Sequence, residues 1–159
     1  MMETGERVRE SLEKVITYHR LVELAVEADL NDINALVPFL TKNPSLLLRT
    51  QVEHTLQNSV VFVARCELGR IIGMITVTPL VTMGGIEGFV SNFVVHGDFQ
   101  GRRIGQELFR LAEEATRLHK FFLTSNGSRE AARHIYGKFG YEEKDTGVFV
   151  KHLCAEPTN

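Results

Sequence analysis

The sequence predicts an α/β (α+β) fold in which one mixed, largely antiparallel sheet carries helices on both faces. Two neighbouring runs of β-branched and aromatic residues, joined by a short connection that contains glycine, have the pattern of an antiparallel hairpin. A strand, helix, strand, helix passage follows, which is typical of helices packed onto a sheet. With 159 residues, 43% of them hydrophobic, the chain fits one core, so we expect a single domain over residues 1–159.

The first elements are expected to be a helix and a short strand. Apolar residues recur at helical spacing near the start, at Val8, Leu12, Val15 and Ile16. They predict an extra amphipathic helix over about residues 5–18, which would lie on the domain or on a partner subunit. Residues 21–25 alternate like a short strand, so we expect the chain to enter the sheet there.

Two helices should follow this strand. Apolar residues of the first are spaced for one buried face and are Leu30, Ile33, Leu36, Val37 and Leu40. Asp29 or Asn31 can begin this helix, and Asn43 and Pro44 interrupt it. Ser45 can cap the second helix. That helix presents on one face Leu48, Val52 and Leu56.

The rest of the chain changes to strands and then alternates. Residues 60–66 and 70–78 form the expected hairpin, with Gly69 in the connection. A pair of glycines breaks the chain before a third strand over residues 89–95. The later elements are expected in the order helix 104–119, strand 121–124, helix 129–139, and closing strands 141–144 and 148–153.

Charge and composition exclude several classes of function. The chain has 18 basic and 20 acidic residues and a formal charge of -2, so it has no overall attraction to nucleic acid or to an acidic membrane. No apolar run approaches the ~18 residues that span a bilayer. The first 13 residues lack the apolar stretch of a secretion signal. We therefore expect a cytoplasmic protein with neither nucleic acid nor membrane as partner.

The metal-binding residue types show no pattern that predicts a metal site. Cys66 and Cys154 have neither the spacing of a metal clip nor the number expected of a disulfide scaffold. The histidines lack ligand spacing, and no H-E-x-x-H occurs. A serine nucleophile is not indicated either, since there is no G-x-S-x-G. We expect an activity that uses no metal.

The clearest chemical signal lies in residues 100–105, Gln-Gly-Arg-Arg-Ile-Gly, between the third strand and the next helix. A glycine-bearing turn and a helix start present unpaired N–H groups, with the positive end of the helix dipole behind them. Gly101 and Gly105 lack a Cβ, so the main chain can approach an anion. Positive charge is added by Arg102, Arg103 and Arg110. The loop suits a pyrophosphate.

Other interpretations of this loop stay open. It can simply turn the chain, with its arginines solvated, or it can hold a different phosphate ligand. It matches neither the dinucleotide pattern G-x-G-x-x-G nor the phosphate loop G-x-x-x-x-G-K-[ST]. NAD and ATP are therefore not supported by motif.

Two blocks of residues resemble the GNAT superfamily of N-acetyltransferases. The family's loop [RQ]-x-x-G-x-[GA], after a strand V-V-x-x-x-[YF], is matched by Val94, Val95, Phe99, Gln100 and Gly105. The family's later pattern A-x-x-x-Y-x-x-x-G-[FY] is matched by Ala132, Tyr136, Gly140 and Tyr141. Arg103 stands where the first of the two loop glycines usually lies. The resemblance covers residues 60–153 and implies a GNAT-like fold.

The resemblance implies acetyl-coenzyme A as cosubstrate and direct attack by an amine on its thioester. The residues expected to hold the cosubstrate are Phe93, Val94, Val95, Gln100, Gly101, Arg102, Arg103, Ile104, Gly105, Arg129 and Tyr136. Tyr136 would also be the general acid, because a phenol can protonate a leaving thiolate. It can equally be part of an apolar helix face. Arg129, in a helix that Ser128 would cap, can reach a phosphate or remain solvated.

The general base is harder to assign. Many relatives carry a carboxylate at the position of Ser91, which cannot serve as a base. Glu87 is our candidate because it has the strand parity of Ser91 and Phe93. It lies roughly 13 Å of extended chain from Ser91, so a water relay would be needed. His96 and Asp98 in the loop are alternative proton acceptors.

Two functions of different classes therefore remain. The first is an acetyl-CoA-dependent N-acetyltransferase acting on a small molecule, a peptide N-terminus or a lysine. The second is a non-catalytic acyl-CoA-binding or sensing module, which the missing carboxylate at Ser91 favours and Tyr136 opposes. Relatives often pair, so a homodimer is compatible with the resemblance. The acceptor itself has no readable motif.

Overall fold

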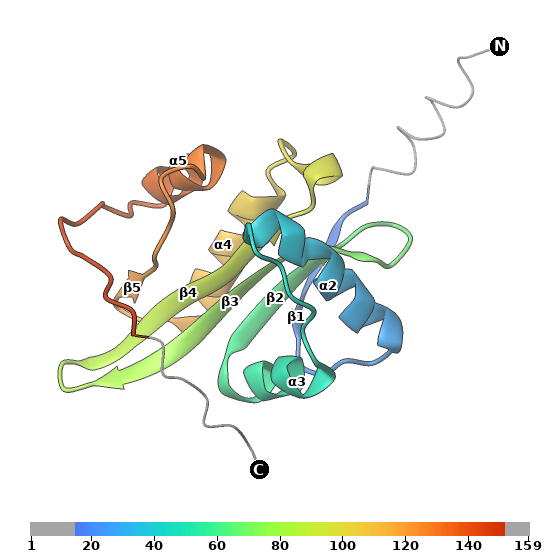
Figure 1. The fold of residues 1–159 in the computed structure, drawn as a ribbon, viewed down its shortest axis with the longest axis horizontal. Coiled ribbons are helices and arrows are strands. Elements are labelled where there is room, and N and C mark those ends of the chain that lie inside the picture. Colours follow the sequence, from blue (N-terminus) through green and yellow to red (C-terminus); the bar gives the residue numbers. More distant parts are fainter. Residues whose placement is uncertain (1–14, 152–159) are drawn as a thin grey trace.

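The computed structural model describes residues 15–151 and contains one five-stranded sheet. The strands lie in the order of the sequence and are β1 (Thr17–Leu21), β2 (Val60–Arg65), β3 (Ile71–Thr82), β4 (Gly85–Val95) and β5 (Phe121–Phe122). Strands β1 to β4 are antiparallel neighbours, and β5 is parallel to β4. The mixed, largely antiparallel sheet predicted from the sequence is confirmed (Figure 1).

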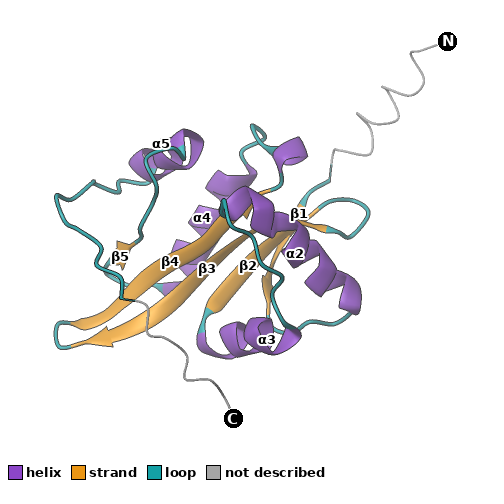
Figure 2. Ribbon diagram, in the orientation of Figure 1, coloured by secondary structure: helices purple, strands orange, loops and turns teal. Residues whose placement is uncertain are grey.

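Helices cover both faces of this sheet, as predicted (Figure 2). They are α2 (Glu27–Leu40), α3 (Arg49–Asn58), the short 3-10 helix η1 (Gly97–Phe99), α4 (Ile104–Thr116) and α5 (Glu130–Lys138). One core cluster joins the sheet to α2 and α3, and a second joins it to α4 and α5. Within residues 15–151, none of the helices has the length and apolar character needed to cross a membrane.

The alternation of β2 explains how one strand serves two cores. Val61 and Val63 belong to the cluster under α2 and α3, whereas Phe62 and Ala64 belong to the cluster under α4 and α5. Because both faces are covered, the strand is a continuous apolar run. This double burial fixes the register of the sheet, since a slip of one residue would exchange the two faces.

The beginning of the chain differs from the prediction. Thr17–Leu21 is β1, which pairs with β2, and residues 15 and 16 are not helical. The predicted helix over 5–18 is therefore wrong at its end, and residues 5–14 lie outside the described part. The strand expected at 21–25 lies four residues earlier. Pairing with a distant strand decides the conformation here, and local periodicity does not contain that information.

The two following helices are confirmed, but their starts are not those expected. Asp29 does not cap α2; it is buried and bound by Arg65 at 2.7 Å. Ser45 does not begin α3 either, since that helix starts at Arg49 and Gln51 accepts the N–H of Leu48 at 2.8 Å. Asp is a preferred N-cap residue, but Asp29 instead forms a tertiary ion pair with Arg65.

The two closing strands predicted over residues 141–144 and 148–153 are wrong in the part that is described. No strand occurs between residues 141 and 151, and residues 152–153 lie outside the described part. The strand predicted over residues 121–124 is also shorter than expected, since β5 has only two residues and so offers little ladder for a further strand. The Tyr141 side chain turns inward and donates to Glu113 at 3.0 Å.

Candidate functional site

The second half of β4, residues 90–95, has a free edge. Strand β5 pairs with β4 only at Gly88↔Phe121 and Phe89↔Phe122. Beyond that point the two segments diverge, and no strand of the described chain pairs with this side of residues 90–95 (Figure 1). Such an edge presents unpaired N–H and C=O groups that an extended ligand can bind.

A β-bulge shapes this edge. Met74 pairs with Val94 and Thr76 pairs with Ser91, so one residue of β3 faces two residues of β4. The extra residue is Asn92, which has a φ of 49°. Asn is among the side chains that tolerate this left-handed region best, so the sequence permits the bulge without signalling it.

The bulge changes which residues of β4 share a face, and this bears on the candidate base Glu87. Val90 and Phe93 both contribute to the core under α4 and α5, although they are three residues apart. Ser91 therefore does not share a face with Phe93. The expectation that Glu87, Ser91 and Phe93 point the same way is wrong, because strand alternation is reset at Asn92.

The loop from Val95 to α4 is built by local hydrogen bonds. Gln100 Nε2 donates to the carbonyl of Val95 at 3.0 Å, closing the turn that contains η1. Gly101 has a φ of 78° and Arg103 a φ of 62°. Arg103 is the N-cap of α4 but gives it no side-chain cap. The first N–H groups of α4 therefore point outward without a capping side chain, which makes an anion site.

The two loop glycines have different purposes in the structure. Gly101 is needed for its positive φ, and a Cβ there would meet nothing within 4 Å. Gly105 is needed for packing, because a Cβ would lie 2.8 Å from Phe93 Cζ and 3.2 Å from Ile135 Cδ1. Gly105 therefore lets the start of α4 rest directly on the ring of Phe93, beside the free edge.

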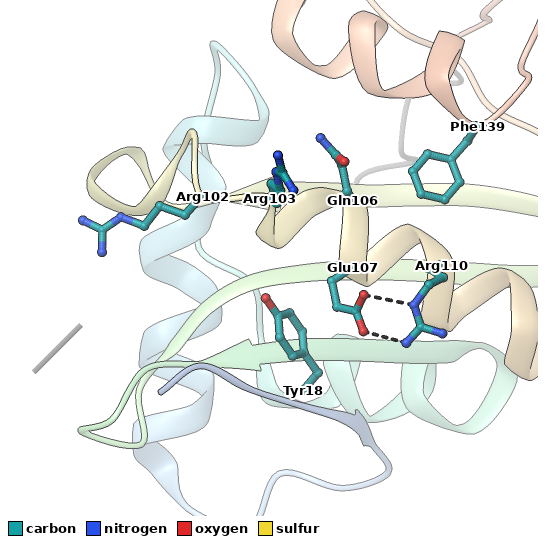
Figure 3. A pocket seen from close by; sticks show the side chains of 7 residues that line it. All are labelled: Tyr18, Arg102, Arg103, Gln106, Glu107, Arg110 and Phe139. Atoms are coloured by element: carbon teal, nitrogen blue, oxygen red, sulfur yellow. Dashed lines mark hydrogen bonds and ion pairs between the residues drawn. The ribbon is translucent and has the colours of Figure 1, made fainter. Parts of the chain in front are cut away.

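A surface pocket of about 420 Å³ opens at the start of α4. It is lined by Tyr18, Arg102, Arg103, Gln106, Glu107, Arg110 and Phe139 (Figure 3). Arg110 is held by Glu107 at 2.6 Å and by Glu114 at 2.7 Å, and these hydrogen bonds raise its pKa. Burial, and then the charge of Glu107, raise the pKa of Tyr18. Arg102 and Arg103 line the same pocket, so the start of α4 carries further positive charge.

Arg129 lies at the free edge itself. Its Nη2 donates to the carbonyl of Phe93 at 2.7 Å. The expected cap of α5 is wrong: the N-cap is Arg129, while Ser128 donates its N–H and hydroxyl to Asn126 Oδ1, each at 2.9 Å. Arg129 therefore ties the start of α5 to the edge of β4.

Tyr136 lies in an aromatic cluster around Phe93. Its ring is 6.0 Å from that of Phe93, 5.7 Å from Phe109 and 6.2 Å from Tyr141. The side chain is buried, and its hydroxyl makes no hydrogen bond within residues 15–151. The hydroxyl of Tyr141, by contrast, is bound to Glu113, and burial followed by the charge of Glu113 raises the pKa of Tyr141. Tyr136 is therefore the phenol of this pair whose hydroxyl has no hydrogen-bond partner among residues 15–151.

The structure does not bring the candidate base Glu87 to this edge. Glu87 lies in the β3–β4 hairpin opposite Leu80 and is paired with Lys120 at 2.9 Å. Eight residues separate it from Val95, roughly 26 Å along the strand. His96 accepts the N–H of Asp98 through Nδ1 at 3.3 Å, so in its neutral form Nε2 carries the proton and cannot accept one.

Sequence reasoning missed a second cavity, of about 180 Å³, on the opposite side of β4 under α2. It is lined by Leu36, Val37, Leu40, Thr41, Asn43, Ser45, Leu47, Met74, Asn92 and Val94. These residues come from a helix, a loop and two strands that no local pattern connects. Polar residues at 91 and 92, inside an otherwise apolar strand, are the only signal the sequence offered.

Comparisons with known proteins identify the family of the chain. Residues 57–143 match the sequence model of the family described as "Acetyltransferase (GNAT) domain". No curated protein matches the chain.

Solved structures match over most of the chain. A Trypanosoma brucei acetyltransferase has 20% identity and a TM-score of 0.69, covering 87% of this chain and 100% of that one. An aminoglycoside acetyltransferase from an uncultured soil metagenomic sample has 17% identity and a TM-score of 0.72, covering 87% and 99%. The Arabidopsis thaliana glucosamine-6-phosphate N-acetyltransferase has 16% identity and a TM-score of 0.64, covering 89% and 100%. At these identities the likeness concerns the fold.

Proposed function

Because this chain belongs to the GNAT acetyltransferase family, we propose that it is an N-acetyltransferase that moves the acetyl group of acetyl-CoA to a primary amine by direct attack on the thioester. One observation carries the proposal. The uncapped start of α4 and the free edge of β4 meet where Gly105 packs on the ring of Phe93. An anion site thus adjoins an extended binding edge, as a cosubstrate with a pyrophosphate and an amide-bearing arm requires.

The loop residues suit the pyrophosphate. The N–H groups at residues 103–106 point out of the helix start, and the helix dipole favours negative charge there. Arg102 and Arg103 line the adjoining pocket. A non-glycine residue in the conformation of Arg103 costs roughly 1–2 kcal/mol, a cost that the fold sustains at the anion site.

The edge of β4 suits the arm that carries the acetyl group. Main-chain groups of residues 93–95 form the unpaired edge, and the carbonyl of Phe93 faces α5, where Arg129 now donates to it. A carbonyl oxygen has two lone pairs, so an amide N–H of the ligand can bind beside Arg129 or replace it. Arg129 acts as a positioning residue because it holds α5, and with it Tyr136, against this edge.

Tyr136 is proposed as the general acid. Its hydroxyl makes no hydrogen bond within the described chain, and its ring packs beside Phe93, whose main chain belongs to the free edge. A phenol placed there can donate its proton to the leaving sulfur of the cosubstrate. Acetyl-CoA supplies the activated acetyl group, and the chain supplies position and the proton.

A second candidate function is a non-catalytic acyl-CoA-binding module. It is favoured by one observation, the ion pair that holds the Glu87 carboxylate against Lys120, away from residues 90–95. The two functions differ in turnover. A transferase releases free thiol from acetyl-CoA in the presence of amines, whereas a binder shows only a thermal shift.

The test of the transferase compares two tyrosine-to-phenylalanine variants by thiol release. Tyr136→Phe is expected to lower kcat by ~100-fold or more, the usual contribution of a general acid, with little change in CoA affinity. Tyr141→Phe is the matched control, because its hydroxyl is already bound to Glu113. Its turnover should stay near wild type. Equal activity of Tyr136→Phe and wild type removes the assignment of the acid, and absence of turnover with every amine favours the binding module.

A further inference from the structure

The cavity under α2 adjoins the free edge of β4 from the opposite side. Asn92 and Val94 line it and flank Phe93, whose carbonyl lies at the free edge. The cavity therefore adjoins the bulged part of β4 that also carries the free edge. At about 180 Å³, it is smaller than the ~300–1,000 Å³ of pockets for drug-sized ligands, so it suits a small acceptor.

The lining of the cavity is uncharged. Six of its ten residues are apolar, and the polar ones are Thr41, Asn43, Ser45 and Asn92. An acceptor with a cationic or phosphorylated body would lose hydration here without gaining an ion pair, which is costly. The body of the acceptor should therefore be neutral and largely apolar.

The charged groups on the surrounding elements are committed elsewhere. Asp29 and Asp32 of α2 are bound by Arg65 and by Arg70, at 2.7 and 3.0 Å. Lys42 is exposed and does not line the cavity. The outward-facing charged residues of α2 and α3 pair with one another and are Glu27, Arg49 and Glu53. No carboxylate of the lining can thus receive an ammonium group or take its proton.

An amine must then enter this cavity already neutral. An α-amino group next to a carbonyl has an ordinary pKa of about 8, whereas an alkylamine such as that of lysine has about 10.4. At pH 7 roughly 10% of the first is neutral but only about 0.04% of the second. The neutral form that an uncharged cavity accepts is therefore a few hundred times more abundant for an α-amino compound than for an alkylamine of the same shape.

Asn92 supplies the polar contact that such an acceptor needs. Its Nδ2 donates to Thr76 Oγ1 at 3.3 Å, and no described residue donates to its Oδ1. That oxygen can accept an N–H from a neutral amine and so orient the nitrogen lone pair. Asn92 is a positioning residue in this arrangement, because an amide oxygen cannot act as a base at neutral pH.

We propose that the cavity under α2 is the acceptor pocket, and that the acceptor is a small α-amino amide with an apolar side chain, positioned by Asn92. This inference rests on the proposed transferase function and specifies its substrate. The same chemistry occurs in a free amino-acid amide and at the N-terminus of a peptide.

The first experiment compares kcat/KM, with acetyl-CoA, for leucinamide and 3-methylbutylamine. The two share one side chain, but only leucinamide has the carbonyl that lowers the amine pKa. We expect leucinamide to be preferred by ~100-fold or more at pH 7, with the gap narrowing as pH rises toward 10. A dipeptide that begins with leucine assigns the source: a faster reaction indicates a peptide N-terminus, and a slower one a free amide. An aminoglycoside or glucosamine 6-phosphate that reacts faster than leucinamide overturns the inference.

The second experiment fills the cavity. Ser45→Trp places a ring at the lining and should lower kcat/KM for leucinamide by ~10-fold or more. Leu46→Trp is the matched control, since Leu46 is the next residue, is 80% exposed and does not line the cavity. Both variants should bind CoA like wild type. Equal kinetics of the two variants overturn the assignment of the pocket.

A third variant tests the effect of a carboxylate in the cavity lining, which has none. Asn92→Asp keeps the shape and the tolerance of positive φ but adds a carboxylate, so the preference for leucinamide over 3-methylbutylamine should fall at least ~10-fold. An unchanged preference overturns the role of Asn92. Calorimetry with CoA distinguishes a failure of this inference from a failure of the proposed function. If wild type binds CoA but prefers charged acceptors, only this inference is refuted. If wild type does not bind CoA, the proposed function is refuted.

Discussion

Replacement of Gly105 tests the contact on which the site is built. In Gly105→Ala, the new Cβ would lie 2.8 Å from Phe93 Cζ, against 3.4 Å for an ordinary contact. The ring would have to retreat by about 0.6 Å, the difference between these distances. It has no room to do so, because it packs edge-on against Phe109 at 4.7 Å and is itself buried. Overpacking of this kind costs roughly 1–3 kcal/mol.

The matched control for this variant is Gly137→Ala in α5. A Cβ at Gly137 would meet nothing within 4 Å. Both substitutions gain helix propensity, about 0.5–1 kcal/mol in each case. The difference between the two variants therefore isolates the packing cost. Gly137→Ala should be slightly more stable than wild type, and Gly105→Ala should be less stable than Gly137→Ala by roughly 1–3 kcal/mol.

Urea unfolding measures these stabilities, and calorimetry with CoA measures the consequence for the site. Because Phe93 supplies both the displaced ring and the edge carbonyl, Gly105→Ala should also weaken CoA binding, while Gly137→Ala should not. Equal stability of the two variants within ~0.5 kcal/mol, the usual range for surface substitutions, would contradict a packing cost at Gly105. CoA binding by Gly105→Ala as tight as that of wild type would contradict the link between this contact and the site.

Three further predictions concern charged and titratable groups. Asp29→Ala should lower the free energy of unfolding by about 3 kcal/mol, because it leaves Arg65 largely buried without its partner, whereas Glu27→Ala, which breaks an exposed pair, should cost less than ~1 kcal/mol. Burial, and then the nearby Arg65, lower the pKa of His19. His19 is therefore protonated more readily in the unfolded state than in the folded state. As pH falls below about 6.5, wild type should lose stability relative to His19→Gln, and above pH 6.5 the difference between the two proteins should not change. If the difference in unfolding free energy between wild type and His19→Gln stays constant from pH 8 to 5, the lowered pKa of His19 in the folded state is contradicted. Glu87→Gln should leave acetyl transfer within ~2-fold of wild type, whereas a loss of ~100-fold would restore Glu87 as the base.

The parts of the fold that the sequence predicted are those with a complete local pattern. The hairpin of β2 and β3 has unbroken apolar runs on either side of a glycine turn, and α4 has apolar residues at helical spacing. In both, local preference and burial agree, so the elements lie close to where they were expected. The position of β1 depends on pairing with β2, about 40 residues later in the chain, and no local signal contains it.

The candidate site divides in the same way. Residues 100–105 were identified because a glycine turn before a helix is a local feature with a direct chemical consequence. The purpose of Gly105 was misassigned, since its contact with Phe93 is known only once β4 and α4 are packed. The bulge at Asn92 and the cavity under α2 depend on register and on four separate segments. Neither the bulge nor the cavity can be predicted from the spacing of residues in the sequence.

The proposed function depends on binding of coenzyme A by the uncapped start of α4 together with the free edge of β4. A calorimetric titration of the wild-type protein with coenzyme A measures this most directly. We expect saturable binding of one molecule per chain with a dissociation constant below ~1 mM, which corresponds to a binding free energy more favourable than about −4 kcal/mol. A titration that shows no saturation at ~1 mM coenzyme A would contradict the claim.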